Sequence, residues 1–337
     1  MLRLLTLSVC LAAALSAQAP RVDTIDFYGL RKTPETKVRE TVGVREGAPL
    51  PPSKGDVEER LDQIPGVVES HLEAVYDSGK NILYIGLEER GAPHFDLREE
   101  PEGDQHLPEK MATEYHSFLE AAAAASRNHI TAEDLTQGHA RSADPATRKI
   151  QDRFPLFATE HLAELRDVLR NSSDEEQRAI AAYIIGYAPN KLDVINDLQY
   201  ALKDSDAGVR SNATRSLVAI EVLSKLDPNL GIKISPTWFI EMLNSLSWSD
   251  RNRAVGALWI LTAQPNAGVL DQIRDRALDS LIEMSRWKTL AHALPPYLLL
   301  GRVLGLPEDQ VKDAWSRGDR DWVIAQATAA QPKKKSK

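Results

Sequence analysis

Six of the eight histidines in this chain of 337 residues fall between positions 94 and 161. Imidazole is the commonest metal ligand in proteins, so this clustering raises the question of a zinc or iron site. Ligands of one metal usually show tight spacing such as His-x3-His, and no pair in this set does. We therefore expect no metal, but surface and packing roles for His94, His106, His116, His129, His139 and His161.

Other catalytic signatures are also missing from the sequence. There is no GxSxG turn for a nucleophilic serine, no glycine-rich phosphate loop and no HExxH helix. The only cysteine, Cys10, lies in an N-terminal leader, so the remaining chain has neither a disulfide nor a cysteine-based metal site. We expect a protein that is not an enzyme and that uses no cofactor.

A pair of aspartate and arginine recurs in the second half of the chain. The stretch DEEQRAIAAYIIG at 174–186 returns 32 residues later as DAGVRSNATRSLV at 206–218. An acid favours the N-terminus of a helix, and an arginine near it can bridge to the same turn of a neighbouring repeat. We therefore expect these residues to have a structural role, as a ladder of contacts between successive repeats. Its residues are Asp174, Arg178, Asp206, Arg210 and, from a looser third copy, Asp250 and Arg253.

Helical hairpins between residues 151 and 330 must position this ladder. Apolar residues recur at helical spacing there, as in Leu162, Leu165 and Leu169, with Ile180 and Ile184 on the partner helix. A repeat period of this length predicts stacked helix pairs that bind along a surface. An insertion, LSKLDPNLGIKISP, lengthens the third unit, and the last stretch has the polar character of a terminal cap.

The repeated units resemble HEAT repeats. The aspartate of that family, at the turn before the second helix, matches Asp174 and Asp206. Its arginine matches Arg178 and Arg210, whereas Gln177 stands where the family prefers valine. The resemblance implies an α-solenoid whose surface binds other proteins. Some HEAT proteins are enzymes, so a HEAT-fold lyase or metal-dependent hydroxylase is the alternative, although the His-Glu dipeptides of the hydroxylases do not occur here.

Residues 22–90 have the pattern of a small α+β domain. The segment VDTIDFYGL predicts a strand, and Val38 and Val42 stand four apart, as on one face of a helix. A second helical stretch, SKGDVEERLDQI, follows. Two alternating runs joined by a turn at 77–81 then predict a pair of strands. The predicted order is β-α-α-β-β, in front of a mainly α chain.

This segment resembles the polypeptide-transport-associated (POTRA) domain of bacterial envelope proteins. The matching pieces, in the order of that family, are IDFYGL, REGAPL, LDQIPGVV and ILYIGLEER, and only one copy is present. The resemblance implies either a docking module that adds an extended peptide to its sheet edge or a spacer that fixes orientation. Both roles stay open.

The chain begins with the pattern of a secretory signal peptide over residues 1–19. Arg3 precedes an apolar run from Leu4 to Leu15, and small residues follow. We expect cleavage between about 16 and 19 and a periplasmic or secreted protein. An uncleaved membrane anchor is the alternative, but the apolar run is shorter than the ~20 residues of a spanning helix.

The remaining segments connect or end these domains. Residues 91–150 begin rich in proline, glycine and acids and are expected to form a linker with a helix. Residues 331–337 are expected to form a disordered basic tail. The formal net charge of -8 and pI near 5.6 argue against nucleic acid as a partner. We expect a protein partner in the cell envelope, with attachment to a membrane surface through the basic tail as the alternative.

Large aromatic and sulfur-containing side chains gather at the start of the third repeat. Such residues are common anchors of protein interfaces, and burial in the solenoid core is the alternative. The candidate contact residues are Trp238, Phe239, Met242 and Trp248.

Overall fold

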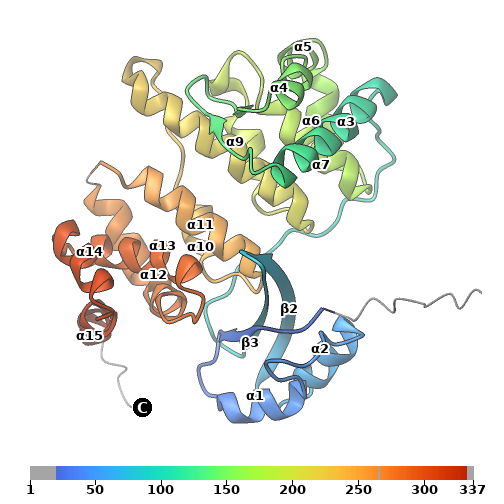
Figure 1. The fold of residues 1–337 in the computed structure, drawn as a ribbon. Helices are drawn as coiled ribbons and strands as arrows, with labels where there is room; N and C mark the ends of the chain where they lie inside the picture. The colour runs from blue at the N-terminus through green and yellow to red at the C-terminus, as the bar shows by residue number, and fades with distance from the viewer. Residues whose placement is uncertain (1–19, 265, 332–337) are drawn as a thin grey trace, which may run out of the picture.

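The computed structural model describes residues 20–264 and 266–331. The leader predicted over 1–19 and the lysines of the predicted tail lie outside the described residues. The described chain is mainly helical with a small sheet near its N-terminus, as the sequence predicts (Figure 1). None of the described helices is both long and apolar enough to cross a membrane.

The N-terminal domain has the predicted order β-α-α-β-β. Its elements are β1 (Thr24–Tyr28), α1 (Glu35–Val42), α2 (Lys54–Asp62), β2 (Val67–Asp77) and β3 (Lys80–Glu89). The sheet order is β1-β3-β2, with β1 parallel and β2 antiparallel to β3. Both helices cover one sheet face, where Ile25, Leu83 and Ile85 pack with Val38 and Leu61 in a separate core.

Residues 91–150 do not form a free linker. After an extended stretch, their elements are α3 (Glu109–Arg127), β4 (Glu133–Asp134), β5 (Arg141–Ser142) and α4 (Pro145–Gln151). Tyr115 and Phe118 of α3 are buried, and both rings contact the ring of Tyr183 in the repeats. These aromatic contacts hold α3 on the solenoid, so the segment is part of the folded unit.

In the described chain, the repeats form one leading helix, four helical hairpins and a final pair of helices. Their elements are α5 (Phe154–Glu160), α6 (Leu162–Asn171), α7 (Glu175–Ile185), η1 (Lys191–Asp193), α8 (Ile195–Ala201), α9 (Ala207–Leu226), η2 (Pro228–Leu230), α10 (Thr237–Met242), α11 (Trp248–Leu261), α12 (Ala267–Ser285), α13 (Leu290–Val303), α14 (Glu308–Ser316) and α15 (Asp321–Ala330). The hairpins are α6–α7, α8–α9, α10–α11 and α12–α13. Their second helices pack against one another in sequence, and we call α7, α9, α11 and α13 the second-helix row.

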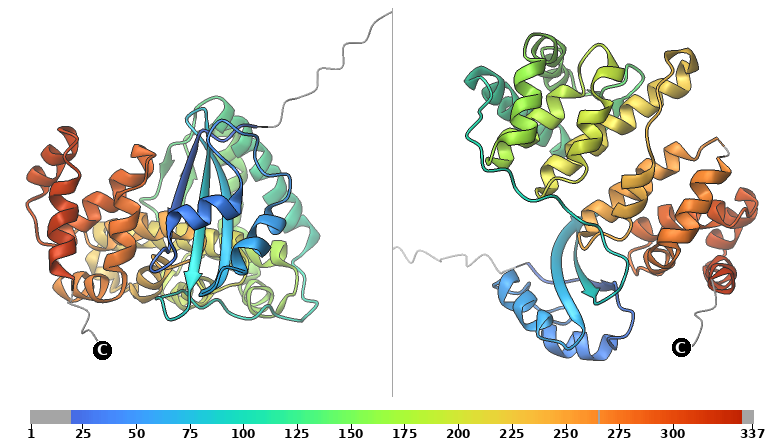
Figure 2. Two further views of the ribbon diagram at one scale, coloured as in Figure 1. Left: turned by 90° about the horizontal axis from the view of Figure 1, so that it is seen from below. Right: turned by 180° about the vertical axis from the view of Figure 1, so that it is seen from behind.

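The turns inside the four hairpins lie along one side of the stack. We call this side the turn edge; it comprises residues 172–174, 202–206, 243–247 and 286–289. The N-terminal sheet faces the α10–α13 half of the stack, and α1 and α2 lie on the far side of the sheet (Figures 1 and 2). The sheet therefore has one face on its own helices and the other on the repeats.

Candidate functional site

The arginine ladder begins with Arg178, which is fully buried. Its Nε and Nη2 donate to the carboxylate of Asp204 at 3.0 Å each, and its Nη1 donates to the Ser172 carbonyl at 2.9 Å. Asp204 lies in the turn of the next hairpin. A bidentate pair of this kind fixes distance and orientation, so Arg178 ties α7 to the α8–α9 hairpin.

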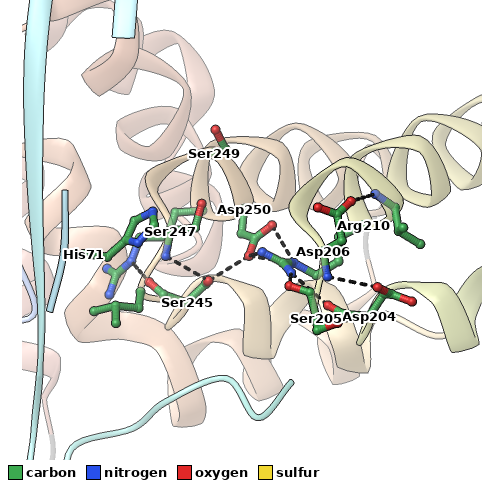
Figure 3. A network of polar contacts seen from close by, with 12 residues as sticks. His71, Asp204, Ser205, Asp206, Arg210, Ser245, Ser247, Ser249 and Asp250 are labelled. Carbon is green, nitrogen blue, oxygen red and sulfur yellow. Dashed lines mark hydrogen bonds and ion pairs between the residues drawn. The ribbon is translucent and has the colours of Figure 1, made fainter. Parts of the chain in front are cut away.

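Arg210 repeats this arrangement one hairpin further along (Figure 3). Its Nε and Nη2 approach Asp250 Oδ2 at 3.0 and 2.8 Å, and its Nη1 donates to the carbonyls of Asp204 and Ser205 at 2.8 Å each. Asp250 also accepts a hydrogen bond of 2.8 Å from the Ser245 hydroxyl. The buried carboxylate is thus fully occupied by partners inside the stack.

The third ladder arginine is Arg251, and the prediction of Arg253 was wrong. Arg251 Nε donates to the Ser245 carbonyl at 2.6 Å, and its Nη1 lies 3.6 Å from Glu283 in the next hairpin. Arg178, Arg210 and Arg251 each donate to the carbonyl six residues earlier. Arg253 instead lines an open groove.

The helix caps explain why sequence reasoning chose the wrong arginine. Asp174 and Asp206 are the N-caps of α7 and α9, and their carboxylates accept amides of the first helical turn at 2.9 to 3.1 Å. The N-cap of α11 is Ser247, so Asp250 lies inside the helix. Spacing was the signal that could have found Arg251, because each ladder arginine follows its N-cap by four residues.

Three of the four candidate contact residues lie in the core. Phe239 and Met242 are buried within the repeats, so they are not available to a partner. Trp248 is buried against the N-terminal sheet, where its ring stacks on Tyr84 with centroids 4.8 Å apart. Trp238 alone is partly exposed, with the Lys203 ammonium 4.9 Å from its ring. The contact prediction is therefore wrong for Phe239, Met242 and Trp248.

Aromatic side chains join the sheet to the repeats. Besides stacking on Trp248, Tyr84 of β3 contacts the ring of Trp287 at 5.1 Å, and its hydroxyl lies 2.6 Å from His292 Nδ1. Tyr28 of β1 donates its hydroxyl to the Leu246 carbonyl at 2.7 Å. Tyr28 and Tyr84 are buried, and burial raises the pKa of both hydroxyls. These aromatic pairs and the two tyrosine hydroxyl contacts make the interface specific, although the indole nitrogens of Trp248 and Trp287 are buried without a hydrogen-bond partner among the described residues.

Carboxylates of the sheet accept amides at the start of two helices of the repeats, one in the first turn of α11 and one just before the N-cap of α13. Neither α11 nor α13 has a side-chain cap of its own, which leaves amides at both N-termini without a local partner. Glu73 of β2 accepts from the amide of Ser249 at 3.2 Å, and Asp26 of β1 accepts from the amide of Lys288 at 3.1 Å. Negative charge is favourable at a helix N-terminus. Each domain therefore completes the hydrogen bonding of the other.

Residues 92–107 continue this contact along the turn edge. The Arg98 amide donates to the Lys203 carbonyl at 2.7 Å, and the Gly103 amide donates to the Asn171 carbonyl at 2.9 Å. The side chain of Gln177 accepts the Leu107 amide at 2.9 Å. This bond accounts for glutamine where HEAT repeats prefer valine. Together with the sheet, the segment contacts all four turns of the stack.

One sheet edge remains open. The Leu72 amide of the edge strand β2 donates to Glu58 of α2 at 2.7 Å, so α2 covers the edge at that point. Successive amides of a strand alternate in direction, so those of Ala74 and Tyr76 face the same way as that of Leu72. Both residues are exposed, and Tyr76 has 74% of its surface free. Residues 74–76 can therefore accept an added strand.

The clustered histidines are spread over separate parts of the surface. The described ranges contain no group of three His, Cys, Asp or Glu side chains placed to hold a metal. The ring of His139 contacts that of Tyr187 at a tilt, with centroids 4.7 Å apart, and burial lowers the pKa of His139 to about 4. Lys191 lies in the same pocket of about 410 Å³, and burial lowers its pKa to about 8. The carboxylate that lines the pocket, Asp152, pairs with Arg141 at 3.2 Å.

Comparison with known proteins assigns part of the stack. Residues 162–228, which span the first two hairpins, match the family described as HEAT repeats. The prediction of HEAT repeats is confirmed for this part of the chain. Such repeats generally mediate protein–protein interaction. No curated protein matches the chain.

Proposed function

We propose that this protein is a non-enzymatic scaffold or assembly factor of the bacterial cell envelope. It binds partner proteins on the surface of the HEAT-type stack, and it binds an extended peptide at the open edge of the POTRA-like sheet. The observation that carries the proposal is the docking of residues 20–107 along the turn edge. That docking leaves the α9 and α11 part of the second-helix row and the edge at 74–76 accessible in one folded unit.

Strand addition supplies the second contact. A peptide beside residues 74–76 would gain main-chain hydrogen bonds from β2, and side chains such as Tyr76 would contribute selectivity. A partner held at the sheet and at the repeats binds more tightly than at either site, because the second contact forms at high effective concentration. This advantage needs the two sites to keep a defined separation, which the docked arrangement provides.

The envelope location rests on the leader sequence and on the POTRA resemblance. The pattern at 1–19 predicts export, so the mature protein begins between about residues 17 and 20. Cell fractionation with N-terminal sequencing of the isolated protein tests this step. A protein recovered from the cytoplasm with Met1 intact contradicts it.

Affinity capture with a matched pair of variants tests the binding role. Ala74→Pro removes the outward amide of β2, whereas Ala74→Thr keeps that amide and favours a strand. Mature protein is crosslinked in its native envelope, and partners are identified by mass spectrometry and by reciprocal capture. We expect a specific partner that Ala74→Pro weakens and Ala74→Thr retains. If neither the wild-type protein nor reciprocal capture yields a partner above background, the proposal fails.

A further inference from the structure

An open groove of about 580 Å³ lies on the second-helix row, between α3, α9 and α11. Each helix contributes residues at the spacing of one helical face. The apolar part of the lining includes Tyr115, Phe118, Leu119, Ala122, Val218 and Ile260. Leu119 has 45% of its surface exposed, although Tyr115 and Phe118 of the same helix are buried in the stack. The groove thus presents apolar surface to solvent.

Two guanidinium groups also line this groove. Arg215 of α9 pairs with Glu133, and a burial penalty lowers its pKa. Arg253 of α11 makes no hydrogen bond and no ion pair with any of the residues that the structure describes. Burial lowers the pKa of Arg253 as well, so its charge is partly removed from water without a partner. The lining carries two cations and one anion, which favours an acidic occupant.

A third polar group points to a ligand at the same place. Thr214 is 3% exposed, and its hydroxyl has no hydrogen-bond partner among the described residues. A buried polar group without a partner is costly, and most such groups in proteins are satisfied by protein, water or ligand. Nε of the adjacent Arg215 is buried and without a partner too. The Thr214 hydroxyl is enclosed while the groove is empty, so a ligand oxygen would reach it once the side chain rotates toward the groove.

The floor of the groove has room for that ligand. Gly256 of α11 is exposed, and a Cβ atom added to it would have no atom within 4 Å. Glycine inside a helix costs stability relative to alanine, so nothing in the helix itself favours this residue. The small residues Gly256 and Ala257 leave a depression next to Arg253.

The two terminal segments outside the described residues do not fit this groove. The leader at 1–19 has Arg3 and no acidic side chain, and the tail at 332–337 has four lysines. Both carry positive charge, as the groove does. A free copy of either segment would therefore be repelled, and an acidic segment of another protein is favoured.

We infer that the groove holds a short segment of a partner protein in which an acidic side chain is flanked by apolar ones. The carboxylate lies between Arg253 and Arg215, and a neighbouring apolar side chain lies over Gly256 against Phe118 and Leu119. The inference rests on the proposed function, because it names the part of the solenoid surface that binds protein and the kind of segment bound.

A random peptide display library, panned on the mature protein, provides the test. We expect enriched peptides to contain Asp or Glu beside apolar residues. Binding of a labelled enriched peptide, measured by fluorescence polarisation, should weaken about tenfold in Arg253→Gln, because a charge-assisted hydrogen bond contributes on that scale. Gly256→Trp should fill the groove and abolish binding, whereas Gly256→Ala should keep binding within about twofold of wild type.

Melting temperatures of the Gly256 variants are measured in parallel, and values close to that of wild type exclude unfolding as the cause of a loss of binding. Enriched peptides that are basic, or that bind equally to all these variants, overturn the inference. Peptides whose binding is lost only in Ala74→Pro bind at the sheet edge; they would support the proposed function and contradict the role of the groove. A library that yields no groove-dependent peptide also overturns it. So does self-association of the chain that Gly256→Trp abolishes, because a second copy would then be the occupant.

Discussion

The carboxylate of Asp26 in β1 accepts a bifurcated hydrogen bond from the amide of Lys288, 262 residues later and just before α13, with both oxygens 3.1 Å from the nitrogen. The side chain of Lys288 reaches back to Glu46 of the N-terminal domain at 2.7 Å. This hydrogen bond lowers the pKa of Glu46, whereas burial raises that of Asp26. The two carboxylates therefore stabilise the docked arrangement over different pH ranges.

Asp26→Asn keeps an acceptor for the Lys288 amide but removes the buried charge. Burial raises the Asp26 pKa above its usual 3.8, so the folded protein holds this proton more tightly than the unfolded chain. The resulting stability is fully present below pH 3.8 and is lost as pH rises through the folded pKa. Between pH 3.5 and 7, we expect the unfolding free energy of the wild type to fall relative to that of the variant in urea denaturation. Parallel curves would contradict the assignment.

Arg210→Ala should destabilise the stack strongly. It leaves the buried carboxylate of Asp250 without its charged partner, and such a loss costs about 3–5 kcal/mol. Arg317→Ala is the control, because the exposed pair of Arg317 with Asp313 contributes about 0–1 kcal/mol. Thermal and urea unfolding of both variants give the comparison. Equal effects would mean that the ladder does not hold the hairpins together.

Arg251→Gln and Arg253→Gln separate the ladder from the groove. The first variant removes the buried link from α11 to Ser245 and Glu283, so we expect a loss of about 2–4 kcal/mol in the unfolding free energy. The second removes no hydrogen bond and should change stability by less than about 1 kcal/mol. A larger loss of unfolding free energy in Arg253→Gln than in Arg251→Gln, measured by urea unfolding, would mean that Arg253 is the ladder residue.

Tyr84→Ala should release the N-terminal domain from the repeats. The variant loses the stacking on Trp248 and the contact with His292, and it leaves a cavity where a fully buried ring was. We expect residues 92–107 to become sensitive to a protease while the solenoid core stays resistant. Tyr76→Ala, on the exposed edge of the neighbouring strand, is the control and should be cut no faster than wild type.

His139→Gln should make the stability of the protein less sensitive to acidic pH than that of wild type. The pKa of His139 is lowered to about 4 by burial, so the unfolded chain takes up a proton before the folded protein does. This contribution is fully present above pH 6.5 and is lost as pH falls from 6.5 towards 4. Melting temperatures across that range should drop more steeply for wild type than for the variant. Identical slopes would show that His139 is not enclosed.

Local patterns predicted the repeats well because their determinants lie within single helices. Asp174 and Arg178 share one turn of α7, as Asp206 and Arg210 do in α9. The aspartates that accept hydrogen bonds from these arginines could not be predicted from the pattern of a single helix. Asp204 precedes its N-cap by two residues, whereas Asp250 follows Ser247 by three. The two carboxylates meet equivalent arginines only because of how the hairpins stack.

The docking of the two domains depended on contacts between distant positions. Asp26 and Glu73 are polar residues in strands, a pattern that usually indicates a solvated sheet face. The run ILYIGL in β3 was the available signal, because continuous apolar residues indicate burial on both faces. The groove could not be predicted from the sequence for a related reason. Sequence reasoning placed Arg253 in the ladder, and Arg253 is seen to be unpaired only when the structure places Arg251 there instead.

Photo-crosslinking in the native envelope tests the central claim most directly. A photoreactive phenylalanine analogue replaces Leu119 in the groove, Tyr76 at the sheet edge or, as a control, Leu192 in η1, which is 52% exposed and distant in sequence from both sites. We predict discrete protein adducts from positions 119 and 76, and none from 192. No adduct from either proposed site, or the same adducts from all three, would contradict a scaffold that binds partners at these surfaces.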